Sequence, residues 1–139
     1  MYNKIKHIKN YNKNIITWEE LLINFSNCVV NNKLIKVRNP GFFISHNADE
    51  IEKIKPIMKK LKVNTAHLYM NIAISIQGLG KHKDSMDVYF LQCQGKTKWI
   101  IEEKNVYILE PGDLLFVPKN VWHEVIPLTP RAGISMSKE

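Results

Sequence analysis

Two histidines and an aspartate are the residues of this 139-residue chain that are best suited to chemistry. His82 and Asp84 are separated by one residue, and in an extended segment such positions point to the same side. His123 lies in a later segment that is also expected to be a strand. Two imidazoles and one carboxylate form the ligand set typical of non-haem Fe(II), which leaves other coordination positions open. We therefore expect His82, Asp84 and His123 to be catalytic metal ligands, although His82 and Asp84 alone could also form a surface salt pair.

The residues before His123 support the metal interpretation. Segment 112–123 reads Gly-Asp-Leu-Leu-Phe-Val-Pro-Lys-Asn-Val-Trp-His, with a glycine, a proline and a histidine at the spacing of the second cupin motif. Asn120 replaces the second glycine of that motif, and Asn is among the non-glycine residues that most readily adopt positive φ. The pattern indicates a strand, a tight turn and a second strand that directs His123 into a barrel.

The stretch from Gly80 to Ser137 resembles the JmjC/cupin-like branch of the Fe(II)- and 2-oxoglutarate-dependent oxygenase superfamily. The matching segments, in the family's order, are His82-x-Asp84, Val88–Gly95, Lys96–Trp99, Pro111-Gly112-Asp113, Pro118 and His123. The resemblance implies a double-stranded β-helix with iron held by His82, Asp84 and His123, and with Fe(II) and 2-oxoglutarate as cofactors. Ordinary cupins have an additional glutamate between their two motifs. None occurs between Asp84 and Glu102, which favours the three-ligand set.

One departure from the family concerns the residue that would hold the far carboxylate of 2-oxoglutarate. JmjC-type members usually have Lys or Arg where this chain has Thr97. Arg131 resembles the arginine that binds this carboxylate in other 2-oxoglutarate oxygenases, in a strand of R-x-S type whose serine is Gly133 here. A guanidinium binds a carboxylate through two parallel hydrogen bonds. We expect Arg131 to bind 2-oxoglutarate, with Thr97 as a hydroxyl partner; alternatively, Arg131 follows Pro130 and faces solvent.

Further candidates for cofactor binding lie on the strand expected over 66–76. Tyr69 and Asn71 share one face of it with Ala73 and Ser75. Their polar groups suit hydrogen bonds to 2-oxoglutarate, but they could equally be satisfied within the core. Asp87 either orients a metal ligand or lies on the surface. The remaining aromatic and histidine candidates are expected to have packing or structural roles: Phe90, Trp99, Trp122, His46 and His67.

The elements expected to position these residues include two helices in the N-terminal part and mostly strands from residue 63 onward. Helices are expected over 18–28, which opens with a capping box from Thr17 to Glu20, and over 48–62, capped by Asn47 or Asp49 and kinked at Pro56. Strands are expected over 33–38, 66–76, 88–93, 98–102, 106–109, 114–117, 121–125 and 132–136. The fold class is therefore mainly β (α+β): a jelly-roll, cupin-like barrel with two N-terminal helices packed outside. We expect one domain over 1–139, with a mixed helical part over 1–62 and the barrel over 63–139.

Composition excludes several other classes of protein. The hydrophobic content of 45% and charged content of 24% are typical of a folded globular chain. Cys28 and Cys93 cannot form a disulfide framework, so we expect free thiols, and Cys93 has no nearby base that would make it a nucleophile. No apolar run approaches the ~18 residues of a membrane span, and the N-terminal segment lacks the apolar region of a signal peptide. We expect a cytoplasmic protein.

The formal charge of +7 lies entirely within residues 1–62. Most of the cations there are lysines scattered among Ile and Asn, with few interleaved aromatics that could stack on bases. The sequence therefore tolerates an acidic partner but does not favour nucleic-acid binding.

The expected function is an Fe(II)/2-oxoglutarate-dependent dioxygenase that uses dioxygen to hydroxylate a C–H bond. Its prime substrate, whether protein, nucleic acid or small molecule, is not readable from the sequence. A homodimer could cover an exposed sheet edge. Two alternatives remain open: a metal-binding cupin enzyme that does not use 2-oxoglutarate, and a non-enzymatic binding module.

Overall fold

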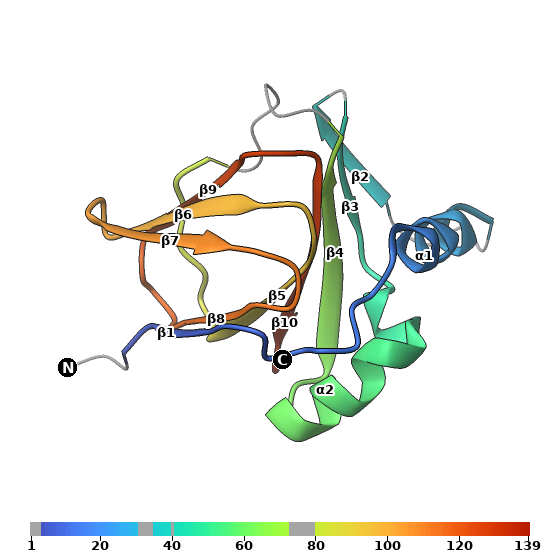
Figure 1. Cartoon of the computed structure of the whole chain (residues 1–139), viewed down its shortest axis with the longest axis horizontal. Coiled ribbons are helices and arrows are strands. Elements are labelled where there is room, and N and C mark those ends of the chain that lie inside the picture. Colours follow the sequence, from blue (N-terminus) through green and yellow to red (C-terminus); the bar gives the residue numbers. More distant parts are fainter. Residues whose placement is uncertain (1–3, 31–34, 40, 73–79) are drawn as a thin grey trace.

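The computed structural model describes residues 4–30, 35–39, 41–72 and 80–139 (Figure 1). The strands are β1 (Lys6–Ile8), β2 (Ile35–Asn39), β3 (Phe42–Ser45), β4 (Thr65–Asn71), β5 (Val88–Gln94), β6 (Thr97–Ile101), β7 (Asn105–Leu109), β8 (Leu114–Val117), β9 (His123–Pro127) and β10 (Arg131–Ser137). The helices are α1 (Trp18–Val30) and α2 (Lys55–Leu61), with two 3₁₀ turns, η1 (Ala48–Glu50) and η2 (Glu52–Ile54).

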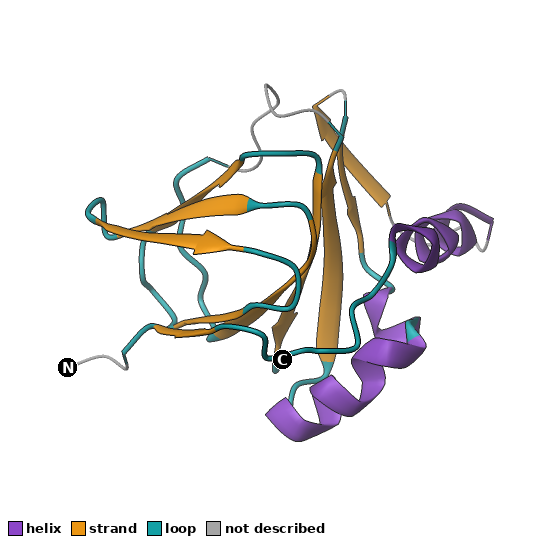
Figure 2. Cartoon of the chain, viewed as in Figure 1, coloured by secondary structure: helices purple, strands orange, loops and turns teal. Residues whose placement is uncertain are grey.

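The described strands form two antiparallel sheets that make up the walls of a barrel. The larger sheet has the order β1-β8-β5-β10-β4-β3-β2, and the smaller one has the order β7-β6-β9. Figure 2 shows the helices gathered beside β2, β3 and β4, on the side of the large sheet away from the small sheet. This arrangement confirms the expected mainly β, jelly-roll fold with helices packed outside.

Side-chain alternation in the large sheet separates two apolar cores. In β5, Phe90 points into the barrel, whereas Leu91 and Cys93 point toward the helices. The barrel core consists of Phe90, Trp99, Ile101, Leu109, Leu115, Val117 and Val121. The core between sheet and helices includes Ile16, Leu21, Ile54, Leu68, Leu91, Ile134 and Met136, each fully buried. Burial of each such side chain contributes roughly 1.5–3 kcal/mol.

The N-terminus of α1 has the expected capping box. The Thr17 hydroxyl accepts the Glu20 backbone N–H at 3.2 Å, and Glu20 Oε1 accepts the Thr17 backbone N–H at 3.0 Å. Lys53 Nζ donates to the same carboxylate oxygen at 2.7 Å and to the Ile15 carbonyl at 2.9 Å. Lys53 therefore ties the 3₁₀ turn η2 to the start of α1.

The single kinked helix expected over 48–62 is wrong. The segment contains η1 and η2, separated by Ile51 in an extended conformation, and only then the seven-residue helix α2. Pro56 lies in the first turn of α2, where its missing N–H has no intrahelical partner to lose, so it does not kink the helix. Neither expected cap holds: Asn47 makes no side-chain cap hydrogen bond and instead donates to the Asn24 carbonyl, and Asp49 lies inside η1.

The other expected strands are present with shifted ends, and the long strand over 66–76 is shorter than expected. β4 ends at Asn71, while Ala73 and Ser75 lie outside the described residues. The turn between β7 and β8 has Gly112 at a φ of 97° and a hydrogen bond from Asp113 N–H to the Glu110 carbonyl. The residues Glu110-Pro111-Gly112-Asp113 suit a type II turn, which favours proline at its second position and requires positive φ at its third.

Asp113 uses this turn to anchor the N-terminal strand. Its buried carboxylate accepts the backbone N–H groups of Asn10 and Glu110, each at 3.1 Å. It also lies 3.2 Å from His7 Nε2 in β1. These contacts hold β1 against β8 at the edge of the large sheet.

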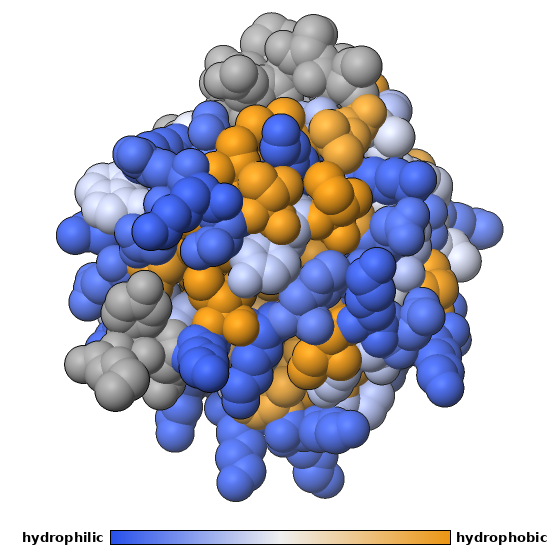
Figure 3. All heavy atoms as spheres, turned by 60° about the vertical axis from the view of Figure 1, so that its left-hand side comes forward, coloured by the Kyte–Doolittle hydropathy of each residue, from blue (hydrophilic) through white to orange (hydrophobic). Residues whose placement is uncertain are grey.

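Apolar side chains remain exposed at the surface of the described chain. Val106, Ile108, Trp122 and Leu128 are each at least 41% exposed, and all belong to the small sheet or its flanks. Figure 3, which brings the side with the β6–β7 turn forward, shows apolar side chains gathered in a patch framed by hydrophilic ones. None of the described helices is long and apolar enough to cross a membrane.

Candidate metal centre and its cavity

The segment that carries His82 and Asp84 does not form a regular strand. His82 forms an isolated bridge with His123, with backbone hydrogen bonds of 2.9 Å and 2.8 Å in the two directions. The Asp84 carbonyl accepts the backbone N–H of Asn120 at 2.7 Å. Asn120 has a φ of 62°, the conformation expected where it replaces glycine. The tight turn before His123 therefore also holds the backbone of the His82–Asp84 segment.

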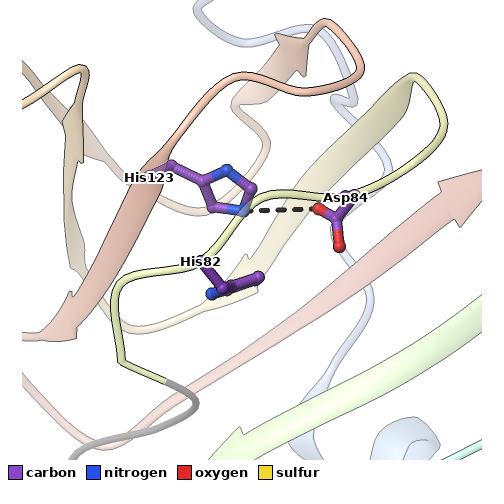
Figure 4. A group of neighbouring side chains, drawn as sticks. All are labelled: His82, Asp84 and His123. Atoms are coloured by element: carbon purple, nitrogen blue, oxygen red, sulfur yellow. Dashed lines mark ion pairs between the residues drawn. The ribbon is translucent and has the colours of Figure 1, made fainter.

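The structure brings His82, Asp84 and His123 together as expected. One potential ligand atom from each lies within 4.8 Å of the other two. His123 Nε2 is 3.4 Å from Asp84 Oδ2, and the two imidazole rings have centroids 4.4 Å apart. Figure 4 shows the three side chains directed toward one another, with His123 from β9 and the other two from the loop before β5.

Hydrogen bonds donated by the Nδ1 atoms set the tautomer of both histidines. His82 Nδ1 is 2.8 Å from the Gly80 carbonyl, and His123 Nδ1 is 3.0 Å from the Val121 carbonyl. Because a carbonyl oxygen only accepts hydrogen bonds, Nδ1 carries the proton in each ring. In the neutral ring, Nε2 then has a free lone pair, which is the arrangement found in metal-binding histidines.

Burial favours the neutral form of His123. The side chain is 4% exposed, and its desolvation is the main cause that lowers the pKa of the imidazole. The nearby His82 lowers the pKa further, while the Val121 carbonyl and the Asp84 carboxylate oppose the shift. Asp84 is 38% exposed and marks the solvent end of the group. The three side chains thus run from solvent into the barrel.

A cavity of about 50 Å³ lies beside these three residues inside the barrel. Both sheets contribute to its wall, as does Gly80 before His82. Its lining consists of Phe42, Tyr69, Gly80, His82, Asp84, Val88, Phe90, Trp99, His123, Val125, Arg131 and Ser135. The site therefore combines metal-ligating atoms, one cation and an otherwise mostly apolar wall.

Arg131 lines this cavity, and the alternative in which it faces solvent is wrong. The residue is 3% exposed, and its Nε donates to Asn71 Oδ1 at 2.8 Å. Burial lowers the pKa of Arg131 to about 10, so the guanidinium is still charged at neutral pH. Of the residues that the structure describes, no Asp or Glu forms an ion pair with it. A buried cation without a counter-ion is costly, which indicates that the cavity is suited to an anion.

The other residues expected to bind the cofactor lie in different environments. Tyr69 lines the cavity, and burial is the main cause that raises the pKa of its hydroxyl, so it is a neutral hydrogen-bond donor. Asn71 is fully buried and orients Arg131. Thr97 is absent from the cavity lining, and its hydroxyl donates to Gln92 Oε1 at 2.9 Å.

The glycine at position 133, where the family's R-x-S strand has serine, has a steric reason. A Cβ atom at this position would lie 2.1 Å from Cζ of the Phe90 ring. Phe90 lines the cavity and packs against Trp99, with centroids 4.8 Å apart. The space that a serine would need is therefore filled by an aromatic ring from the neighbouring strand.

Phe90 and Trp99, which were expected only in the core, also line the cavity. Trp99 is 3% exposed and stacks on His123, with centroids 5.4 Å apart and an angle of 24° between the rings. Its buried indole N–H has no hydrogen-bond acceptor among the described residues. The role of Trp99 could have been inferred from strand alternation, because Thr97, Trp99 and Ile101 share the inward face of β6.

Trp122, which was expected to have a packing role, is not buried. Its side chain is 41% exposed, and the ammonium groups of Lys81 and Lys83 lie 5.8 Å and 5.2 Å from its ring centroid. Asp87 follows the surface alternative: it is exposed and accepts the Lys119 backbone N–H at 2.9 Å.

The remaining histidines and cysteines lie outside the cavity wall. His46 and His67 contact each other, with Nδ1 atoms 2.7 Å apart. Cys28 and Cys93 are buried free thiols, as expected, and burial raises the pKa of Cys93 well above its usual range. A thiol held in its protonated form is a poor nucleophile.

Comparison with known proteins relates this site to a family. A family model described as the JmjC domain matches residues 43–107, which include His82 and Asp84. Ribosomal oxygenase 2 of Rattus norvegicus is 29% identical over 79 residues, covering 42% of this chain and 17% of the rat protein.

Solved structures share the fold over most of the chain. YcfD, a ribosomal oxygenase from Escherichia coli, superposes in complex with cobalt and succinic acid with a TM-score of 0.75 and 16% identity. Its complex with cobalt and 2-oxoglutarate gives a TM-score of 0.72, and both matches cover 98% of this chain and 48% of YcfD. KdgF from Halomonas sp. has a TM-score of 0.54 and 15% identity, covering 78% of this chain and 92% of KdgF.

The chain therefore spans about half the length of YcfD and a smaller share of the rat protein. The structural likeness, at these identities, concerns the fold, while the JmjC model and the rat relative connect the sequence to oxygenases. Together with the barrel, these matches confirm that the chain resembles the JmjC/cupin-like branch of the Fe(II)- and 2-oxoglutarate-dependent oxygenase superfamily.

Proposed function

We propose that the protein is an Fe(II)/2-oxoglutarate-dependent oxygenase that hydroxylates a C–H bond of its substrate. The observation that carries this proposal is a buried guanidinium, that of Arg131, in the cavity that also contains His82, Asp84 and His123. A metal-binding trio alone would suit several classes of cupin. A buried cation beside it calls for an anionic ligand, and a keto acid that also reaches the metal meets that requirement.

The three proposed metal ligands fit Fe(II) by their chemistry. In their neutral forms His82 and His123 present Nε2 lone pairs, and Asp84 presents a carboxylate, which together form a 2-His-1-carboxylate set. The low pKa of His123 keeps its lone pair available at neutral pH. Trp99, stacked on the His123 ring, restricts the orientation of that ligand.

The remainder of the cavity fits the far carboxylate of 2-oxoglutarate. Because Nε of Arg131 is engaged by Asn71, its two terminal nitrogens are left to bind a carboxylate as a planar fork. The neutral Tyr69 hydroxyl lines the same cavity and can donate a further hydrogen bond. Thr97 was expected to be a hydroxyl partner in binding 2-oxoglutarate. In this proposal it has no direct contact with the cofactor and donates its hydrogen bond to Gln92.

With Fe(II), 2-oxoglutarate and dioxygen bound, such a centre supplies hydroxylation of a C–H bond coupled to conversion of 2-oxoglutarate into succinate and carbon dioxide. The protein's own contribution is to hold iron and 2-oxoglutarate in the correct relative positions and to exclude water from the reacting groups. The apolar wall formed by Val88, Phe90 and Val125 serves the second purpose.

The relatives support both the cofactors and a class of substrate. YcfD was solved with cobalt together with 2-oxoglutarate or succinic acid, the co-substrate and co-product of this reaction. Both YcfD and the rat relative are named ribosomal oxygenases. We infer that the substrate of this protein is a component of the ribosome, which places the protein where ribosomes are found.

The test is an anaerobic titration of the Fe(II)-loaded protein with 2-oxoglutarate. A keto acid bound to iron through two oxygens produces a visible charge-transfer band. We expect a saturable band that disappears in His82→Ala and needs at least about tenfold more 2-oxoglutarate in Arg131→Ala, since one charge-assisted bidentate contact is lost. Iron binding without the band would leave a cupin enzyme that does not use 2-oxoglutarate. Absence of iron binding would contradict the enzyme proposal altogether.

A further inference from the structure

A second surface feature, which we call the basic groove, lies on the large sheet beside the C-terminal end of α2. It consists of two adjoining hollows of about 580 Å³ and 330 Å³ that share Leu61, Asp87 and Tyr89. No residue of the basic groove also lines the His82 cavity. It is therefore separate from the proposed metal centre.

Lysines dominate the charge of the basic groove. Five of them line it and are exposed: Lys4, Lys6, Lys62, Lys119 and Lys138. None of the five forms an ion pair within the described part of the chain, whereas Lys53, Lys55, Lys81 and Lys96 each pair with a glutamate. The one carboxylate in the groove, Asp87, already accepts the Lys119 backbone N–H. The groove thus presents uncompensated positive charge, which favours a polyanionic partner.

Aromatic rings lie between these lysines. Tyr89 and Phe116 are directly opposed on β5 and β8, with ring centroids 4.9 Å apart. Tyr11 lines the same groove, with the Lys60 ammonium 5.5 Å from its ring centroid. The Tyr11 hydroxyl is buried and has no hydrogen-bond partner among the described residues. An acidic peptide would use the lysines alone, whereas unpaired bases would also use the rings.

We propose that the basic groove binds single-stranded nucleic acid, with phosphates on the lysines and unpaired bases against Tyr89 and Tyr11. The sequence did not favour this, because the N-terminal lysines lie mainly among Ile and Asn, with Tyr11 as the one Phe, Trp or Tyr within residues 4–13. The fold supplies the interleaving from distant segments: β1, β5, β8 and the end of α2. The proposal is independent of the metal centre.

The test is fluorescence anisotropy of a labelled oligouridylate of about twelve nucleotides with the full chain, over a range of salt concentrations. The variant Lys6→Gln/Lys62→Gln/Lys119→Gln removes three groove charges. The matched control Lys96→Gln/Lys98→Gln/Lys104→Gln removes the same charge from the β5–β6 turn, β6 and the β6–β7 turn. We expect the groove variant to lower affinity at least tenfold and to reduce the slope of log affinity against log salt by about 2. The control should change affinity less than twofold.

A second variant and a competitor separate base stacking from charge alone. Tyr89→Leu keeps an apolar side chain against Phe116, and it should weaken binding about fivefold or more if a base stacks there. Unlabelled oligouridylate should displace the probe far better than polyglutamate of equal charge. Equal losses in both lysine variants, equal competition by polyglutamate, or no saturable binding would each overturn the proposal.

Discussion

Arg131 and Asn71 are directly opposed across the antiparallel pair β10–β4, and the arginine Nε donates to the asparagine Oδ1 at 2.8 Å. Both side chains are buried, at 3% and 0% exposure. The contact fixes the orientation of the guanidinium without neutralising it, because an amide oxygen carries no formal charge. The cation therefore stays available to a ligand.

Replacing Asn71 with aspartate tests whether that available charge serves the cofactor. Asn71→Asp would give Arg131 a carboxylate partner of the same shape, so we expect higher thermal stability, by about 1 kcal/mol or more. For the same reason the affinity for 2-oxoglutarate should fall at least about tenfold. Thermal denaturation and the anaerobic titration measure the two effects. Asn71→Ala is the control, and it should weaken 2-oxoglutarate binding while lowering stability. If Asn71→Asp raised both the stability and the affinity for 2-oxoglutarate, the assignment of Arg131 to the cofactor would be contradicted.

Asp84 and Asp87 provide a matched pair for testing the metal centre. Asp84 lies within 4.8 Å of both histidine ligand atoms, whereas Asp87 accepts a backbone N–H on the surface. A metal that binds only the folded state at 100 times its dissociation constant stabilises that state by about 2.7 kcal/mol. We expect Mn²⁺ to raise the melting temperature of the protein and of Asp87→Ala, but not of Asp84→Ala. An equal rise in all three proteins would exclude Asp84 as a ligand.

Much of the site was predictable because its determinants are local in sequence. The His82-x-Asp84 spacing, the turn at Asn120 and the strand that starts at His123 each depend on short-range rules of backbone conformation. Arg131 followed from its place in the resemblance. The strand periodicity also predicted the barrel, with ends that moved by a few residues.

The features that could not be predicted from the sequence depend on contacts between distant segments or on the backbone conformation of single residues. One continuous helix over 48–62 would have the same apolar pattern as the observed η1, η2 and α2. The break depends on the extended conformation of Ile51, which separates η1 from η2. The clash between a serine at position 133 and Phe90 involves two strands that are far apart in sequence. Trp122 is a different case: strand alternation turns it outward once His123 points inward, so its exposure could have been anticipated.

Gly133 gives a prediction about packing beside the cavity. Gly133→Ser restores the family's serine, but its Cβ would meet the Phe90 ring, so we expect destabilisation of about 1–3 kcal/mol. Urea denaturation measures the loss. The double variant Gly133→Ser/Phe90→Leu should recover part of it, because the shorter side chain makes room for the serine. Additive losses in the double variant would show that the Phe90 ring is not the obstacle.

Glu20 gives a prediction about pH. The hydrogen bond from Lys53 is the main cause that lowers the pKa of the Glu20 carboxyl below its usual 4.5, with a further contribution from the Thr17 backbone. A carboxyl whose pKa is lowered by folding stabilises the protein above its usual pKa and loses that effect as the pH falls toward the lowered value.

We therefore expect Glu20→Gln, which can keep the capping hydrogen bond but not the charge, to lower the free energy of unfolding by about 0.5–1 kcal/mol at pH 7. The difference from the unmodified protein should shrink as the pH approaches 3, and urea denaturation at both pH values measures it. Glu19→Gln is the control, because Glu19 is exposed and forms no ion pair within the described part of the chain. If the effect of Glu20→Gln were the same at both pH values, the ion pair with Lys53 would not be its source.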